Sequence, residues 1–147
     1  MAPKTLFCSA ALALALATGC GKEAGRISFT AEGLGSGSMT LKPGEVSFWT
    51  DIDMSYEGDA ALAYHIELSQ GGSKVATALC NPLGSLPVKT GWVESNIGSS
   101  HSRRGLGKMP CSATVTSGGA TALSVRLAFS KTPAKYTLKQ ADLVVRQ

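Results

Sequence analysis

The segment FWTDIDMSYEGD, residues 48–59, places four carboxylates within twelve positions: Asp51, Asp53, Glu57 and Asp59. Carboxylates at this density could ligate a metal ion, act as a catalytic acid pair, or form the solvated side of a strand. A calcium loop of the EF-hand type that starts at Asp51 would need glycine where Tyr56 stands and glutamate where Leu62 stands. The spacing therefore argues against a metal site, and we expect no metal or other cofactor.

The residues around these carboxylates alternate in polarity, as expected for a half-buried strand. One face of 46–56 carries Val46, Phe48, Thr50, Ile52, Met54 and Tyr56. The other face carries Ser47, Trp49, Asp51, Asp53 and Ser55. A second alternating segment covers 62–68, and the residues Glu57-Gly58-Asp59 predict a hairpin turn between the two strands.

Pairing of these two strands as a hairpin would bring five side chains onto one face: Trp49, Asp51, Asp53, His65 and Glu67. Such a face could bind a glycan, with the indole stacking on a sugar ring and the carboxylates and imidazole bonding its hydroxyls. The alternative is a solvated sheet face. Carboxylates two residues apart could also hydrolyse a glycoside, but a wet strand offers no burial to raise a pKa. We therefore expect no enzyme and no catalytic residue.

A second candidate site is the segment 99–110, SSHSRRGLGKMP, which we interpret as a basic, glycine-rich loop. Its cations are Arg103, Arg104 and Lys108. They could contact phosphate, anionic headgroups or polysaccharide, or the segment could be a solvated loop. It does not match a phosphate-binding P-loop, because the first glycine and the final Ser/Thr are missing. Trp92 nearby is interpreted as a core or edge aromatic.

The remaining pattern is also that of strands. Residues 123–129 alternate, and shorter candidates cover 27–31, 37–41, 74–80, 88–93 and 111–116. In the last segment the alternation slips near Lys139-Gln140, which predicts a β-bulge. Outside the first 20 residues no helix is indicated. About eight strands in one domain, residues 27–147, predict an all-β fold, a two-sheet antiparallel β-sandwich.

Two segments carry a resemblance to a known architecture. LKPGEVSFWTDIDM, residues 41–54, and the closing ATALSVRLAFS and YTLKQADLVV resemble the entry strand and the last two strands of jelly-roll carbohydrate-binding modules and galactose-binding-like domains. The resemblance implies a jelly-roll-like sandwich whose last strand packs beside the strand at 46–56. It does not by itself imply a function.

The N-terminus, MAPKTLFCSAALALALATGC, has the pattern of a signal peptide. Lys4 precedes an apolar run over 6–17 that is too short to span about 30 Å of hydrocarbon as a helix. Ala17-Thr18-Gly19-Cys20 resembles the lipobox of bacterial lipoproteins. This implies cleavage after residue 19, a lipid on Cys20, and a lipidated tether over 20–26. Glycine rather than aspartate at position 21 implies the outer membrane.

Two cysteines remain after the signal peptide and the lipidated residue, Cys80 and Cys111. In an oxidising compartment an even pair predicts a disulfide, which would stabilise the fold by about 3–4 kcal/mol. The chain has a formal charge of +4, and +3 without Lys4. That charge is too small and scattered to indicate nucleic-acid binding. We expect a membrane-anchored envelope lipoprotein that binds a glycan; the alternative is an assembly role in contact with another envelope protein.

Overall fold

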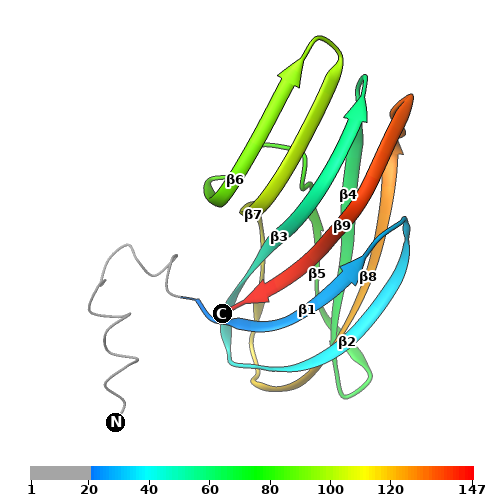
Figure 1. Ribbon diagram of the computed structural model, residues 1–147. Helices are drawn as coiled ribbons and strands as arrows, with labels where there is room; N and C mark the ends of the chain where they lie inside the picture. Colours follow the sequence, from blue (N-terminus) through cyan, green and yellow to red (C-terminus); the bar gives the residue numbers. More distant parts are fainter. Residues whose placement is uncertain (1–20) are drawn as a thin grey trace.

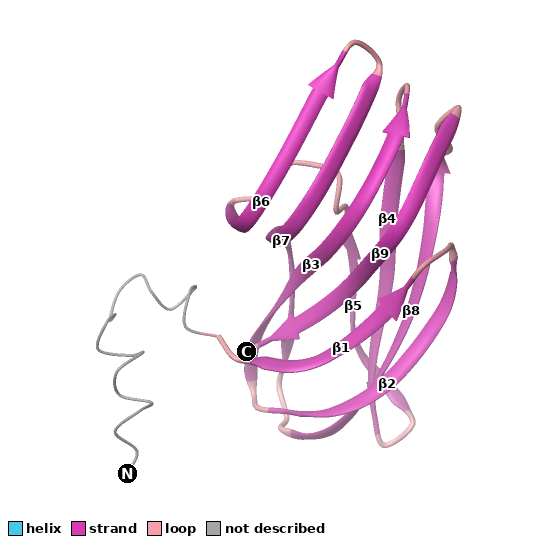
Figure 2. Ribbon diagram, viewed as in Figure 1, coloured by secondary structure: helices cyan, strands magenta, loops and turns pink. Residues whose placement is uncertain are grey.

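The computed structural model of the protein describes residues 21–147, which form nine β-strands (Figures 1 and 2). The predicted signal peptide, residues 1–19, and the predicted lipidation site, Cys20, lie outside the described residues. Within 21–147 no helix is long and apolar enough to cross a membrane.

The strands form two antiparallel sheets that pack face to face, so the predicted β-sandwich is confirmed. The five-stranded sheet contains, in spatial order, β1 (Glu23–Phe29), β9 (Lys135–Arg146), β3 (Gly44–Glu57), β7 (Ser100–Val115) and β6 (Val88–Ile97). The four-stranded sheet contains β2 (Gly33–Leu41), β8 (Gly119–Lys131), β4 (Ala61–Gln70) and β5 (Ser73–Cys80).

The connectivity is that of a jelly roll. The chain changes sheet at every connection except the hairpins β4–β5 and β6–β7. This gives two four-strand layers in the orders β1-β9-β3-β7 and β2-β8-β4-β5, with β6 added at the edge of the first. The last strand, β9, lies directly beside β3, as the resemblance implied.

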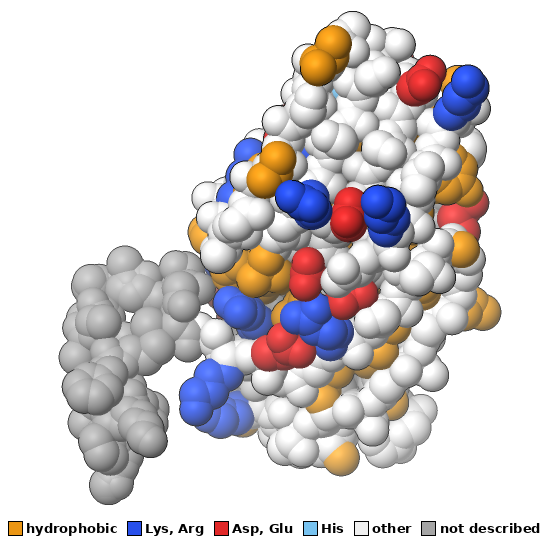
Figure 3. Space-filling view, in the orientation of Figure 1, with side chains coloured by type: hydrophobic (Ala, Val, Ile, Leu, Met, Phe, Trp, Pro, Cys, Tyr) orange, Lys and Arg blue, Asp and Glu red, His pale blue; other side chains and the backbone are white. Residues whose placement is uncertain are grey.

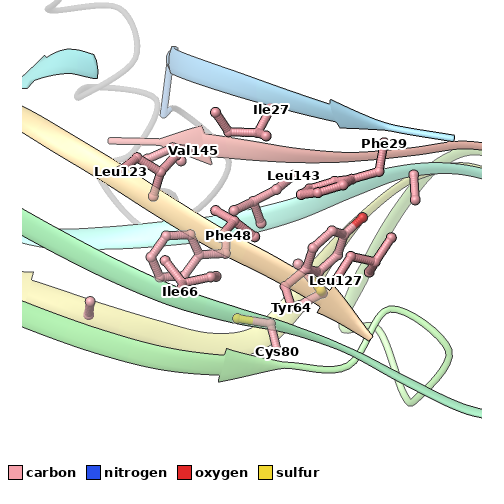
Figure 4. Packing of buried hydrophobic residues seen from close by; sticks show 14 of the residues in the cluster. Ile27, Phe29, Phe48, Tyr64, Ile66, Cys80, Leu123, Leu127, Leu143 and Val145 are labelled. Carbon is pink, nitrogen blue, oxygen red and sulfur yellow. The ribbon is translucent and has the colours of Figure 1, made fainter. Parts of the chain in front are cut away.

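The core lies between the sheets and is built from the inward residues that alternation predicts. On β3 the whole predicted inward face, from Val46 to Tyr56, is buried. Figure 4 shows Phe48 and Leu143 of one sheet facing Ile66 and Leu127 of the other. The buried hydroxyls of Thr50 and Tyr64 bond each other at 2.8 Å, so neither is left unpaired in the core.

Two local predictions are confirmed. Between Asp53 and Met54 the pairing of β3 with β9 jumps from Gln140 to Leu138, so Lys139 is the extra residue of a bulge. Cys80 and Cys111 form a disulfide with a Cα–Cα distance of 5.5 Å. It joins the end of β5 in one sheet to β7 in the other, and so links the two layers covalently.

The predicted tether over 20–26 is wrong for its last four residues, which belong to β1. Even Lys22 is paired: its N–H and C=O bond the C=O and N–H of Gln147, each at 3.0 Å. The polar residues of this segment suggested a tether, but Arg26 and Glu23 form an ion pair at 3.0 Å over the sheet instead. The sandwich therefore begins almost at Cys20.

Candidate functional site

The structure separates the five residues that were expected on one face. β3 pairs with β7 and β9, whereas β4 pairs with β5 and β8, so the predicted hairpin is wrong. The connection at 58–60 crosses from the five-stranded sheet to the four-stranded sheet, so β3 and β4 bury their apolar faces against each other's sheet. Trp49, Asp51 and Asp53 therefore lie on the outer face of the five-stranded sheet. His65 and Glu67 lie on the outer face of the four-stranded sheet.

Trp49 points outward as predicted but is only 3% exposed. The guanidinium of Arg146 lies over its ring, 4.5 Å from the ring centroid. The indole N–H donates to Ser47 Oγ at 3.3 Å. A cation–π contact of this kind buries the aromatic surface, so the indole is not available here as a platform for a sugar ring.

Asp51 belongs to an ion network centred on Arg26. The Arg26 guanidinium donates to Asp142 Oδ2 at 2.8 Å and to Asp51 Oδ2 at 3.0 Å, and it also pairs with Glu23. Hydrogen bonds to Glu23 first, and then to the two aspartates, raise the pKa of Arg26 above its usual range. The same bond to Arg26 lowers the pKa of Glu23. Because these carboxylates are satisfied by one cation, the network serves to hold β1, β9 and β3 together.

Asp142 is the member of this network that sequence reasoning missed. It is 5% exposed and also accepts a hydrogen bond from Gln140 Nε2 at 3.1 Å. A signal was present, because an aspartate inside the apolar run ADLVV has to find a partner if the strand is buried.

The segment interpreted as a basic loop is part of strand β7, so that prediction is wrong. Its glycines serve close packing between strands: Gly105 has φ +138°, and a Cβ there would lie 2.6 Å from the Gly91 carbonyl oxygen across a bulge in β6. The three cations do not form one cluster. Arg104 and Lys108 face outward, opposite Asp53 and Trp49, and Arg103 faces inward.

Arg103 joins a polar cluster on the inner side of the β6–β7 hairpin that the sequence did not indicate. Its guanidinium donates to Asn96 Oδ1 at 3.0 Å and lies 3.7 Å from Glu94 Oε2. Trp92, which packs partly buried on the core as expected, donates its indole N–H to Glu94 Oε1 at 2.9 Å. This bond is the largest cause of a lowered pKa at Glu94. His101 stacks on the ring of Tyr56, with 5.0 Å between the ring centroids.

The outer face of the five-stranded sheet is hollowed in the half away from residues 21 and 147. Two adjoining depressions of about 600 and about 300 Å³ share Ser55 and Thr137, and we call them together the distal hollow. A row of four hydroxyl residues crosses four strands here: Thr137, Ser55, Ser102 and Ser95. Figure 3 shows acidic and basic side chains across the middle of this face and a mostly uncharged area above them.

Charged side chains line the distal hollow. On one side are Asp53, Arg104 and Lys139, and on the other are Glu57 and Lys135. Tyr136 borders the larger depression, but it pairs with the inward-facing Tyr56, and its ring packs against Phe129 of the opposite sheet at a centroid distance of 4.8 Å. The tyrosine ring therefore points away from the outer face. Two predicted candidates, Asp53 and Arg104, therefore meet at this site, while the hydroxyl row was missed.

Two more predicted candidates, His65 and Glu67, line a separate depression of about 590 Å³ on the outer face of the four-stranded sheet. Glu67 forms an ion pair with Lys74 at 3.3 Å. His65 is exposed between Arg126 and Leu79.

Among residues 21–147 no three His, Cys, Asp or Glu side chains are grouped so as to hold a metal ion. No protein-family model matches the chain, and no match was found among curated proteins or among solved structures.

Proposed function

We propose that the protein is a lipid-anchored binding protein of a bacterial cell envelope, and that its distal hollow binds a glycan. The observation that carries the proposal is the combination found in one shallow hollow: a row of hydroxyls, two carboxylates and three cations. Sugars present hydroxyls that both donate and accept hydrogen bonds, which matches this polar lining.

The shape of the hollow favours a chain over a small enclosed ligand. Sites for small molecules usually bury most of the ligand in a cleft, whereas this hollow is open and extends across β9, β3 and β7. Hydroxyls on neighbouring strands are spaced by about 4.8 Å, which is close to the size of one sugar ring. A polysaccharide strand lying across the sheet could therefore contact several of them in turn.

The position of the hollow also fits an anchored protein. Cys20 is the residue before Gly21, and Lys22 is already bonded to Gln147, so a lipid on Cys20 would attach with almost no tether. Ser47 lies opposite Arg146 at that end of β3, and Ser55 is eight residues further along. At about 3.4 Å per residue, the hollow is held about 27 Å from the anchored end.

The test is a glycan array probed with the purified lipidated protein in detergent. Ser55→Ala removes one hydroxyl from the middle of the row, and Asp53→Asn removes one carboxylate acceptor. We expect each substitution to weaken the strongest glycan signal about tenfold, in line with the loss of one hydrogen bond to the glycan. Asp59→Asn is the matched control, since Asp59 is an exposed carboxylate away from the hollow. Binding that survives both hollow substitutions would refute the proposal.

A further inference from the structure

The outer face of the four-stranded sheet carries a row of four side chains, one from each strand: Leu34, Arg126, His65 and Leu79. Their neighbours along β8 and β4 are buried in the core, so Arg126 and His65 point outward. Leu34 is 79% exposed and Leu79 is 64% exposed, and both line the depression of about 590 Å³. We infer that this row binds an extended segment of a partner protein in which an acidic side chain is flanked, two residues away on each side, by aliphatic side chains.

Arg126 is the source of the charge complementarity. Within the part of the chain that the structure describes, its guanidinium has no carboxylate within 4.0 Å. The acidic residue beside it on this face, Glu67, forms an ion pair with Lys74 at 3.3 Å. With exposed His65 directly opposite on β4, the centre of the row is a cationic spot without its own counter-ion. Arginine recognises a carboxylate through two parallel hydrogen bonds, which makes an acidic side chain the best-matched ligand.

The two leucines set the spacing of the partner. Adjacent strands lie about 4.8 Å apart, so the three intervals between Leu34 and Leu79 span about 14 Å. In an extended peptide, side chains on one face repeat every second residue, about 6.8 Å apart. Aliphatic residues at the first and fifth positions are thus about 14 Å apart, and an acidic residue at the third position falls midway between Arg126 and His65. The row and such a segment match in both length and order.

The chemistry of this face favours a peptide over a sugar. The depression has no Phe, Tyr or Trp among its lining residues, so it offers no large ring on which a sugar could stack. Its exposed apolar groups are aliphatic, and burying them against aliphatic partners is favourable by about 25 cal/mol per Å². This inference goes beyond glycan binding and concerns the opposite sheet, so either proposal can fail without the other.

The test uses the full lipidated protein in detergent and a dye-labelled acetyl-Leu-Ser-Glu-Ser-Leu-amide peptide, with fluorescence anisotropy as the readout. We expect saturable binding that weakens about tenfold when the peptide glutamate is replaced by glutamine, because one charge-assisted pair is lost. Arg126→Gln should weaken binding of the glutamate peptide by a similar factor. Lys108→Gln, which removes an outward-facing cation of the other sheet outside the distal hollow, is the control and should change nothing.

Two further variants test the aliphatic contacts, and a competition experiment tests whether a free carboxylate is enough for binding. Leu34→Ser and Leu79→Ser change only exposed side chains, and each should weaken the peptide about fivefold. Sodium acetate should compete only at far higher concentration than the unlabelled peptide. The inference is overturned if no binding saturates, if the glutamine peptide binds equally well, if Arg126→Gln has no effect, or if acetate competes as well as the peptide.

Discussion

Asp142 and Asp51 lie opposite each other on β9 and β3, and each accepts a hydrogen bond from Arg26 Nη1 through its Oδ2. Removing one or the other should nevertheless have different consequences for stability. The side chain of Asp142 is 7% exposed and that of Asp51 is 32% exposed. Asp142→Ala removes a nearly buried acceptor of two hydrogen bonds, from Arg26 and Gln140. Asp51→Ala removes one acceptor at the edge of the network.

The magnitudes follow from burial. A hydrogen bond to a charged group contributes about 1.5–3 kcal/mol. Arg26 is one-third exposed and keeps Glu23 in either variant, so water screens part of the loss. We expect Asp142→Ala to lower the free energy of unfolding by about 2 kcal/mol. Asp51→Ala should cost only about 0.5 kcal/mol, as exposed pairs usually do.

Urea unfolding at neutral pH measures this difference. With an m-value of about 2 kcal/mol per molar urea, Asp142→Ala should move the midpoint down by about 1 M and Asp51→Ala by about 0.25 M. Asp59→Ala, with a side chain that is 84% exposed, is the control and should not move it. Equal shifts of the midpoint for Asp142→Ala and Asp51→Ala would refute the claim that burial sets the strength of these contacts.

Three other predictions follow from the fold and the N-terminal motif. Phe48→Ala should lower the free energy of unfolding by about 3–5 kcal/mol through lost burial and a cavity, whereas Asp53→Ala should change it by less than about 0.5 kcal/mol. Denaturant unfolding of the two variants measures the difference, and equal losses would contradict the inward–outward assignment of β3. Cys20→Ser should leave the protein unprocessed or release it from membranes, as fractionation and intact mass would show; a wild-type N-terminus without lipid would disprove the anchor. Because the pKa of Glu94 is lowered in the folded state, its contribution is present above pH 4.5 and is lost as pH falls through the lowered value. Trp92→Phe should raise that pKa in an NMR titration, and an unchanged pKa would refute the role of the indole.

The strands and their inward faces could be predicted because alternation with a period of two reports burial directly. On β3 every residue expected to face inward is buried, and the bulge at Lys139 was visible as a slip in the same pattern. The pairing of strands could not be predicted in the same way. A hairpin and a crossing to the opposite sheet both leave β3 and β4 with alternating residues, so the pattern cannot distinguish them.

The candidate site depended on information that one strand does not contain. Trp49 was correctly placed on the outward face, but its exposure is decided by Arg146, almost 100 residues away along the chain. The glycines of β7 were taken as signs of a loop because their role, the close approach of Gly105 to Gly91, exists only after β6 and β7 pair. The distal hollow likewise joins Ser55 of β3 and Ser102 of β7, and no local signal indicates that these two strands are adjacent.

The two outer faces differ in how their charges are used, and this difference supports separate roles. On the five-stranded sheet, Arg26 satisfies its aspartates and Arg146 covers Trp49, so the half nearest the chain termini is occupied by contacts within the protein. The distal hollow adds accessible polar groups in the other half of that sheet. On the four-stranded sheet, Arg126 has no acidic partner among the described residues, and two leucines are exposed beside it. Since the inward residues of both sheets are committed to one core, substitutions on either outer face can change binding without unfolding the sandwich. That separation lets the glycan and peptide proposals be tested independently.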